Sequence, residues 1–366
     1  FSTFNADAIR DVTLYKGGMP AQYGGRLASV LDIKMIEGNN KQFQGEGGLG
    51  LIASRLKLEG PLIKDKASFM VSGRRTYADL FLKLSGNSDI NQSKLYFYDL
   101  NLKANYRLNE RNNLYLSGYF GKDILGYSDL FRFGWGNATG TLRWYHILHN
   151  RLFSNTTVVY SDYNYQVDIL NEQVDFVIAS DIRSVNIKQD FQHYSSPNST
   201  FRFGAELHSQ AIQPSQINAE EGSAINTLSI EKRRGSELAA YIAHEWNPLP
   251  NLSMNNGLRF NNFFSLDPGH SYHYLSLEPR VSLNFKTNQQ SSVKAAYNRA
   301  SQMIHQLSNA TSSLPTDAWV LSNDRIAPQY ADQFSIGYYR TLYNNQYEAS
   351  VEAYYKNMQN QIYYRD

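Results

Sequence analysis

The chain has 366 residues, of which 14% are aromatic and 19% are charged, and its net charge is +2. This balance gives no electrostatic footprint for nucleic acid, and the absence of cysteine excludes a disulfide scaffold, a cysteine-ligated zinc site and thiol catalysis. The charged fraction lies below the roughly 25% of a typical soluble domain, yet the mean hydropathy of −0.49 is not that of a hydrophobic protein. No run of about 18 apolar residues occurs, so no helix is expected to span a bilayer.

The first notable element is a glycine-rich stretch at residues 15–35, YKGGMPAQYGGRLASVLDIKM. It contains two Gly-Gly pairs and a proline, and then passes directly into an alternating apolar and polar run at residues 27–34. Glycine reaches positive φ and allows one backbone to approach another closely. The stretch fits neither a phosphate-binding loop nor a dinucleotide motif. An ordinary turn and a close contact between two chain segments remain the two interpretations.

From about residue 43 onward the sequence alternates with a period of two, which is typical of strands with one apolar and one polar face. Residues 98–108, YDLNLKANYRL, alternate without a break. We predict about 14 antiparallel strands of roughly ten residues. They begin near residues 43, 67, 95, 114, 136, 151, 182, 200, 235, 252, 274, 290, 329 and 346.

Short and long links alternate between these strands. Links such as HNR at 149–151 and NPLPN at 247–251 are turn-like. The links at 78–94, 123–133, 211–233 and 302–328 are longer. One end of the sheet is therefore expected to carry tight turns and the other long loops, as in outer-membrane barrels. A soluble β-sandwich is the alternative. Charged residues such as Lys103, Arg259 and Glu278 on one face, opposite apolar residues, favour a barrel with a wet lumen.

The N-terminal motif is similar to a known family. The stretch at 15–34, followed by FQGEGGLGLIASRLKLEGPL, resembles the junction between plug and barrel in TonB-dependent outer-membrane receptors of the kind abundant in Bacteroidota. In that family the plug ends in GG-P-x-YGGR-x-S-x-LD. This chain matches at Gly17, Gly18, Pro20, Tyr23, Gly24, Gly25, Arg26, Ser29, Leu31 and Asp32. Later segments, among them VSGRRTY, LEPRVSLNF and SLPTDAWVLSNDRIAPQYADQFSIGYY, are similar to the same family in order.

The resemblance implies an all-β fold, a transmembrane antiparallel β-barrel with the C-terminal part of a plug domain. The whole protein would have 22 strands, with about 14 in this stretch. Residues 1–39 would be the end of the plug and residues 40–366 the N-terminal part of the barrel. About eight strands and most of the plug would then lie outside this stretch. GGRLASVLDIKM replaces the GANGVILITTK-like strand of the large glycan importers, so the chain resembles the branch without an obligatory lipoprotein lid.

The implied function is TonB-dependent import of a ligand through a plugged barrel in the bacterial cell outer membrane. The implied partners are the TonB-ExbB-ExbD motor, through an N-terminal segment not in this stretch, outer-membrane lipid and lipopolysaccharide, and a surface lipoprotein or other outer-membrane subunits. The alternative is a receptor-like barrel that acts as a scaffold subunit of a larger outer-membrane assembly. Neither breaks a bond, so we expect no enzyme activity, no cofactor and no nucleic-acid partner.

Two sets of residues are candidates for contact between plug and barrel. The hinge set is Gly17, Gly18, Pro20, Tyr23, Gly24, Gly25 and Arg26, and the lumen charges are Glu206, Arg259, Glu278 and Arg280. By the resemblance, Arg26 is expected to pair with an inward carboxylate such as Glu206 or Glu278. Loss of one partner of a buried pair costs about 3 to 5 kcal/mol, so release of such a pair would loosen the plug. The alternative is that these charges only line a hydrated interior.

Aromatic residues of the long links are candidates for ligand or partner contact. These are Tyr127, Phe131, Phe133 and Trp319, expected in loops over a rigid scaffold. Packing of the loops on one another is the alternative. Arg74 and Arg75 fall toward the loop end of the second strand, as solvated girdle charges or as contacts to a ligand or to lipopolysaccharide phosphates. No histidine pair has carboxylates at metal-ligand spacing, and no G-x-S-x-G or H-E-x-x-H motif occurs. We therefore expect no metal or catalytic site.

Overall fold

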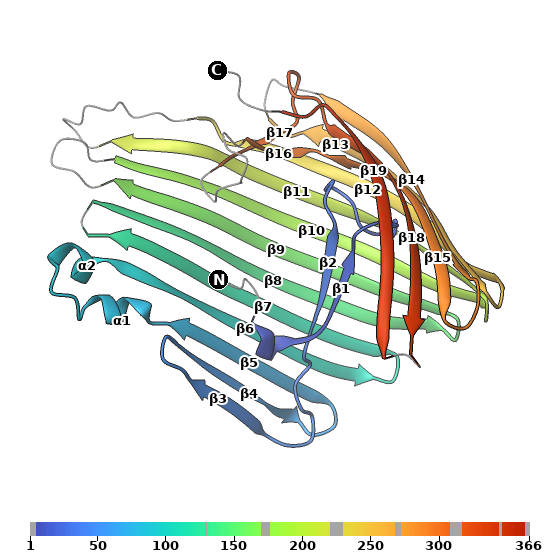
Figure 1. Cartoon of the computed structure of the whole chain (residues 1–366), viewed down its shortest axis with the longest axis horizontal. Coiled ribbons are helices and arrows are strands. Elements are labelled where there is room, and N and C mark those ends of the chain that lie inside the picture. Colours follow the sequence, from blue (N-terminus) through green and yellow to red (C-terminus); the bar gives the residue numbers. More distant parts are fainter. Residues whose placement is uncertain are drawn as a thin grey trace.

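The computed structural model describes residues 5–128, 130–169, 176–219, 230–267, 272–307, 317–343 and 346–362. Within them, 15 strands form one antiparallel sheet that follows the chain from β3 to β15 and continues through β18 to β19 (Figure 1). No described helix has the length and hydropathy to cross a membrane. The strands of this sheet are β3 Gln44–Leu49, β4 Ala53–Ile63, β5 Ala67–Thr76, β6 Lys94–Asn109, β7 Asn112–Tyr127, β8 Phe131–His149, β9 Leu152–Ile169, β10 Phe176–Ser196, β11 Ser199–Ala219, β12 Arg233–Leu249, β13 Leu252–Ser265, β14 His273–Lys286, β15 Ser291–Gln302, β18 Gln329–Leu342 and β19 Tyr347–Gln359.

The remaining elements are short. A 3-10 helix at Ala6–Ala8 precedes β1 (Ile9–Tyr15), which pairs with β2 (Val30–Met35) in a separate two-stranded sheet. Two short helices, α1 (Ala78–Leu82) and α2 (Ser88–Gln92), lie between β5 and β6. A second two-stranded sheet, β16 (Ile304–Leu307) with β17 (Ala318–Leu321), lies between β15 and β18.

The predicted sheet of antiparallel strands is confirmed, with corrections at several boundaries. The segment that begins near residue 43 forms two strands, β3 and β4, because a tight turn in which the Gly50 amide donates to the Ala53 carbonyl separates them. The second of these strands, β4, extends through Pro61 to Ile63. The predicted long link at 123–133 is also wrong, because β7 runs to Tyr127 and β8 begins at Phe131. Residues 211–219 likewise belong to β11.

The asymmetry between the two ends of the sheet is confirmed. Two-residue turns join β6 to β7, β8 to β9, β10 to β11 and β12 to β13, all at the same end. At the opposite end, residues 77–93 contain the two short helices and residues 303–328 contain the β16–β17 hairpin. This is the arrangement of short periplasmic turns and longer extracellular loops in outer-membrane barrels.

The two faces of the sheet reverse the pattern of a soluble protein. One face, called the outer face below, exposes apolar side chains such as Leu100, Leu102 and Leu116, the last at 58% of its surface. The opposite, inner face buries polar residues, among them Asp99 and Asn101 on the same strand. Lipid covers apolar side chains without a protein partner, so this distribution is that of a transmembrane barrel wall.

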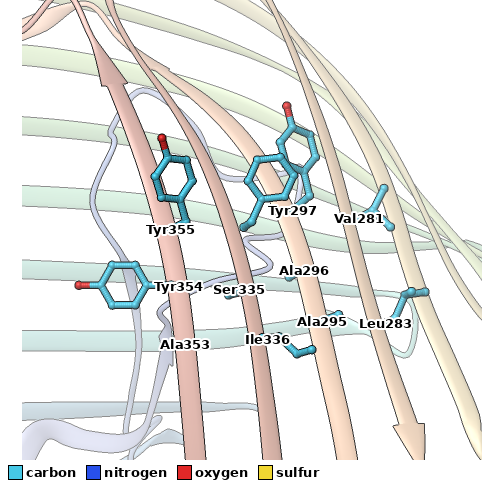
Figure 2. Close-up of a pocket in the computed structure, with 11 residues that line it drawn as sticks. Val281, Leu283, Ala295, Ala296, Tyr297, Ser335, Ile336, Ala353, Tyr354 and Tyr355 are labelled. Carbon is cyan, nitrogen blue, oxygen red and sulfur yellow. The ribbon is translucent and has the colours of Figure 1, made fainter.

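Part of the outer face is hollowed where β14, β15, β18 and β19 meet (Figure 2). The depression has a volume of about 540 Å³ and is lined by Leu283, Ile336 and several aromatic rings. Tyr297 and Tyr355 point their hydroxyl groups the same way along the strands in Figure 2. Tyrosines at one level above an apolar band are typical of the membrane interface.

The N-terminal segment lies against the inner face (Figure 1). The Asn5 amide donates to Ser72 Oγ of β5 at 2.9 Å. At the other end of the sheet, Gln333 Nε2 of β18 donates to the Lys16 carbonyl at 3.2 Å. Strands far apart in the sheet therefore contact one short segment, because the sheet curves around it.

Candidate functional site in the lumen

The site is built on residues 17–27, called the glycine loop below. The Tyr23 amide donates to the Pro20 carbonyl at 3.1 Å and closes a turn at its centre. Gly18 and Gly25 have φ values of 61° and 75°, a region in which a side chain would be strained. The glycine-rich stretch therefore forms a turn, as the first interpretation predicts. The next observations show that it also lies in close contact with another chain segment, as the second interpretation predicts.

At the other two glycines of the loop, Gly17 and Gly24, the neighbouring side chains leave no room for a Cβ atom. A Cβ added at Gly24 would lie 2.3 Å from Arg259 Nε, and one added at Gly17 would lie 2.9 Å from Ser335 Oγ. Real Cβ atoms do not approach other atoms so closely. The glycine loop thus rests directly on side chains of β13 and β18.

Arg280 of β14 joins the loop to the sheet. Its Nη1 donates to the Pro20 carbonyl at 2.6 Å and to the Tyr23 carbonyl, and its Nη2 donates to Glu278 Oε2 at 2.6 Å. Arg280 is 2% exposed and Glu278 is fully buried. Hydrogen bonds from a charged donor are the stronger kind, so one guanidinium holds two loop carbonyls while its charge is neutralised by its own strand.

Arg259 and Asn261 of β13 extend this arrangement into a network. Arg259 Nη2 donates to Glu206 Oε2 at 2.9 Å and its Nε donates to Asn261 Oδ1 at 2.8 Å. Asn261 Nδ2 then donates to Glu278 Oε1 at 2.6 Å, and Glu237 Oε1 lies 3.9 Å from Arg259 Nη2. The four predicted lumen charges are therefore together, in one buried network behind the glycine loop.

The predicted pairing of Arg26 with Glu206 or Glu278 is wrong. The structure pairs those carboxylates with Arg259 and Arg280, which lie on the same wall and reach them first. Arg26 Nη1 instead donates to the Gly25 carbonyl at 2.9 Å. Its side chain is exposed to the lumen, yet the surrounding wall desolvates it enough to lower the pKa of its guanidinium, against the attraction of Glu237.

Two lysines that the sequence reasoning missed also hold the loop. Lys188 Nζ of β10 donates to the Gln22 carbonyl at 2.7 Å and lies 5.5 Å from the centre of the Tyr23 ring. Lys356 Nζ of β19 donates to the Leu27 carbonyl at 2.7 Å. Both lie on the polar face of an alternating strand, and that position is the signal by which they could have been found.

The aromatic candidates are not all in loops. Tyr127 and Phe131 end β7 and begin β8, with ring centres 6.4 Å apart, and Phe133 lies 4.8 Å from Trp135 on the same strand. Their expected loop location is wrong, because the strands extend further than the alternation indicated. Contact with a ligand or partner stays a prediction for these residues.

The fourth candidate, Trp319, lies in the β16–β17 hairpin. The hairpin packs on the inner face through a buried apolar cluster of Ile212, Phe263, Met303, Ile304 and Leu321, and Trp319 packs against that cluster. Trp319 is half-buried. A long link of the sequence therefore folds over the inner face at the long-loop end of the sheet.

His305 is a buried group in this hairpin, outside the spanning strands. It is fully buried, its Nε2 lies 2.7 Å from Ser322 Oγ, and its Nδ1 has no hydrogen-bond partner among the described residues. Burial disfavours the charged imidazolium and lowers the pKa of His305 to about 4. The hairpin therefore holds a neutral histidine at neutral pH.

We expect the hairpin to loosen in acid. Above the ordinary histidine pKa of about 6.5 both the packed and the open hairpin are neutral at His305. Between pH 6.5 and the His305 pKa of about 4 in the packed hairpin, the imidazole is protonated only when the hairpin is open. The free energy of opening should therefore fall by up to about 2 kcal/mol at pH 5.

The fluorescence of Trp319, with Trp135, Trp144 and Trp246 replaced by phenylalanine, should report this opening as the pH is lowered from 7.5 to 5. A His305→Gln variant keeps a polar side chain that cannot titrate. If it shows the same pH response as the parent, His305 is not the responsible group.

The chemistry of the site is that of binding. Arginine and lysine side chains donate to backbone carbonyls, and each guanidinium of the network is neutralised within the wall. Among the described residues, no group of three His, Asp or Glu side chains is placed to hold a metal ion. The arrangement can hold the glycine loop in place and can release it without a chemical step.

Comparison with known proteins gives a consistent fold. A family model described as "TonB dependent receptor-like, beta-barrel" matches residues 65–366. The ferric enterobactin receptor PfeA from Pseudomonas aeruginosa superposes with a TM-score of 0.70 at 14% identity, covering 98% of this chain and 59% of the receptor. The ferric preacinetobactin receptor BauA from Acinetobacter baumannii gives 0.68 at 11% identity, over 96% and 60% of the two chains. The copper transporter OprC gives 0.71 at 11% identity, over 96% and 60%.

These structures show a shared fold, and this chain spans about 60% of their length. No curated protein matches the sequence.

Proposed function

The chain belongs to the family of TonB-dependent receptors, and from that premise we propose that residues 1–39 are the C-terminal end of a plug and residues 40–366 the first part of the barrel around it. The family places the protein in the bacterial outer membrane. The separate β1–β2 sheet and the hydrogen bonds from the inner face to the N-terminal segment support this division. Further strands would pair with the edges of β3 and β19, because lipid cannot satisfy an unpaired strand edge.

The proposed activity is import of a ligand through the plugged barrel. The observation that carries it is the set of hydrogen bonds from Arg280, Lys188 and Lys356 to carbonyls of the glycine loop. They hold the loop across the lumen in the resting state. A segment held through its backbone can detach one hydrogen bond at a time, and water replaces each lost donor.

Because of the ion pairs within the wall, detachment of the glycine loop requires little free energy. Glu206 and Glu278 are paired with Arg259 and Arg280, which belong to the wall itself. When the loop leaves, these pairs stay intact and no buried charge loses its partner. The several kcal/mol that an unpaired buried charge costs are thus avoided during each transport cycle.

The driving force would come from the TonB-ExbB-ExbD motor, which pulls on an N-terminal segment of such receptors. The ligand is proposed to be a small metal chelate. This proposal rests on the structural neighbours, which include receptors for ferric enterobactin and ferric preacinetobactin. The family consists of receptors and transporters, which agrees with a protein that performs no catalysis.

The test begins with mass spectrometry of ligand that co-purifies with the full-length protein. Uptake of that compound, radiolabelled, is then measured in cells with and without TonB. We expect uptake only in cells that have TonB. Binding without any TonB-dependent uptake would contradict transport and favour the scaffold alternative.

A further inference from the structure

Leu27, at the end of the glycine loop, is held by the wall at three points. Its amide donates to Gln302 Oε1 of β15 at 3.1 Å, and its carbonyl accepts from Lys356 Nζ of β19 at 2.7 Å. Its side chain is buried in a cluster with Ala300 and Ala331, which lie opposite each other on β15 and β18. The glycine loop can therefore leave the wall at this end only if Gln302 releases the Leu27 amide.

The same glutamine side chain also holds the β16–β17 hairpin. Gln302 is the last residue of β15, and its Nε2 donates to the carbonyl of Ile304, the first residue of β16, at 2.7 Å. The Ile304 side chain is buried in the apolar cluster through which the hairpin packs on the wall. When the hairpin leaves the wall, Ile304 moves with it and its carbonyl is withdrawn from Gln302.

These two hydrogen bonds require a side chain that both accepts and donates. The Leu27 amide is a donor and needs the side-chain oxygen, whereas the Ile304 carbonyl is an acceptor and needs the side-chain nitrogen. The two partners thus fix the orientation of the Gln302 amide group. A carboxylate at this position would keep the first bond but would repel the Ile304 carbonyl, and a methionine would make neither bond.

A further interaction between loop and hairpin is electrostatic. The positive charge of Arg26, after the larger effect of burial, contributes to the lowered pKa of His305. At pH 7.5 the imidazole is neutral in the packed and in the open hairpin, so this repulsion is absent there. Coupling between the loop and the hairpin at that pH must therefore be carried by other contacts, and the Gln302 amide supplies one.

We propose that Gln302 couples the hairpin to the glycine loop, so that release of either one favours release of the other. Without the Ile304 carbonyl, the Gln302 side chain regains rotamers in which its oxygen cannot reach the Leu27 amide. Such coupling is reciprocal, because each element changes the equilibrium of the other by the same factor. A neutral hydrogen bond corresponds to a factor of about five. This coupling resides in the wall, the hairpin and the loop, and it does not depend on transport.

The first measurement opens the hairpin and follows the loop, in the full-length protein in lipid nanodiscs at pH 7.5. Leu321→Asp places an unpaired carboxylate in the apolar cluster, which forces the hairpin off the wall. Hydrogen exchange at the Leu27 amide should then become about fivefold faster. Gln302→Glu keeps the acceptor for Leu27 but not the donor for Ile304, so adding Leu321→Asp to this variant should not accelerate the exchange further.

The reciprocal measurement detaches Leu27 and follows the hairpin. Lys356→Met removes the donor to the Leu27 carbonyl. Acrylamide quenching of Trp319, as the single tryptophan of the protein, should then report an opening constant about fivefold larger. In Gln302→Met, which makes neither hydrogen bond, Lys356→Met should leave the quenching unchanged. This second measurement decides the question if the glutamate variant does not fold.

Gln333→Met is the matched control, because Gln333 also donates from the inner face to the N-terminal segment, at the carbonyl of Lys16 instead of at Leu27. Both fivefold responses should persist in this variant. The heat-dependent mobility shift in SDS confirms that each variant is folded. Equal responses in the parent and in the Gln302 variants, no response in the parent, or loss of both responses in Gln333→Met would overturn the proposal.

Discussion

Replacing Arg280 by methionine should lower the free energy of unfolding by about 3 to 5 kcal/mol and release the glycine loop. The substitution leaves Glu278, which is fully buried, without its ion-pair partner. It also removes both hydrogen bonds that the guanidinium donates to the Pro20 and Tyr23 carbonyls. The stability of the barrel wall and the attachment of the glycine loop should therefore both decrease in this variant.

Hydrogen exchange of the Tyr23 and Leu27 amides measures the loop, and thermal unfolding measures the wall. The double variant E278Q/R280M removes the orphaned charge, so it should regain part of the thermal stability but none of the loop protection. Arg340→Met, at an exposed arginine of β18, is the matched control and should change neither. Unchanged exchange at Tyr23 in the Arg280 variant would contradict the assigned contact.

Replacing Gly24 by alanine should lower the free energy of unfolding by about 3 kcal/mol, because overpacking of a filled site costs about 1 to 3 kcal/mol and an ion pair is disturbed as well. The added Cβ would lie 2.3 Å from Arg259 Nε and 2.7 Å from its Cζ. Arg259 is 2% exposed and holds Glu206 and Asn261, so it has little room to move. Either the guanidinium leaves its partners or the glycine loop lifts from the wall.

A double-mutant cycle with Arg259→Met separates this clash from a general effect of alanine. Contacting residues give non-additive changes, so Gly24→Ala should cost much less stability in the Arg259→Met background. Gly140→Ala is the control, since an added Cβ there meets no atom within 4 Å, and it should leave the thermal midpoint unchanged. Additive losses would show that Gly24 and Arg259 do not interact.

The alternation of the sequence was sufficient to predict the sheet and its two faces. Lipid on one side and a wet lumen on the other impose a strict period of two, as in residues 98–108 of β6. The alternation was insufficient to predict where the strands end beyond the apolar band. At Gly126 and Arg132 the outer face of β7 and β8 carries small or charged residues, whereas the inner face carries Leu125 and Phe133. The apolar and polar faces are therefore exchanged at this level, and the strands were predicted too short.

The sequence predicted which residues belong to the candidate site, but not which of them pair with one another. The pair of Glu278 and Arg280 could have been predicted, because the two residues are separated by one position and share a face of β14. The partner of Arg26 could not, because alternation gives the face of a residue and not the loop that lies opposite. The contacts of Lys188 and Lys356 with the glycine loop depend on how the sheet curves, which no local pattern encodes.

The central claim is that the glycine loop lies inside the barrel against the wall. It is tested most directly by a disulfide between residues 17 and 335, since this chain contains no cysteine. A Cβ at Gly17 would lie 3.6 Å from Ser335 Cβ, within the range of a disulfide. The variant G17C/S335C should therefore cross-link almost completely in intact outer membranes under mild oxidation, as seen by peptide mass spectrometry. The pair G17C/S68C should not cross-link, because Ser68 contacts the carbonyls of residues 37 and 38 instead. Absence of the first cross-link, or equal formation of both, would contradict the account.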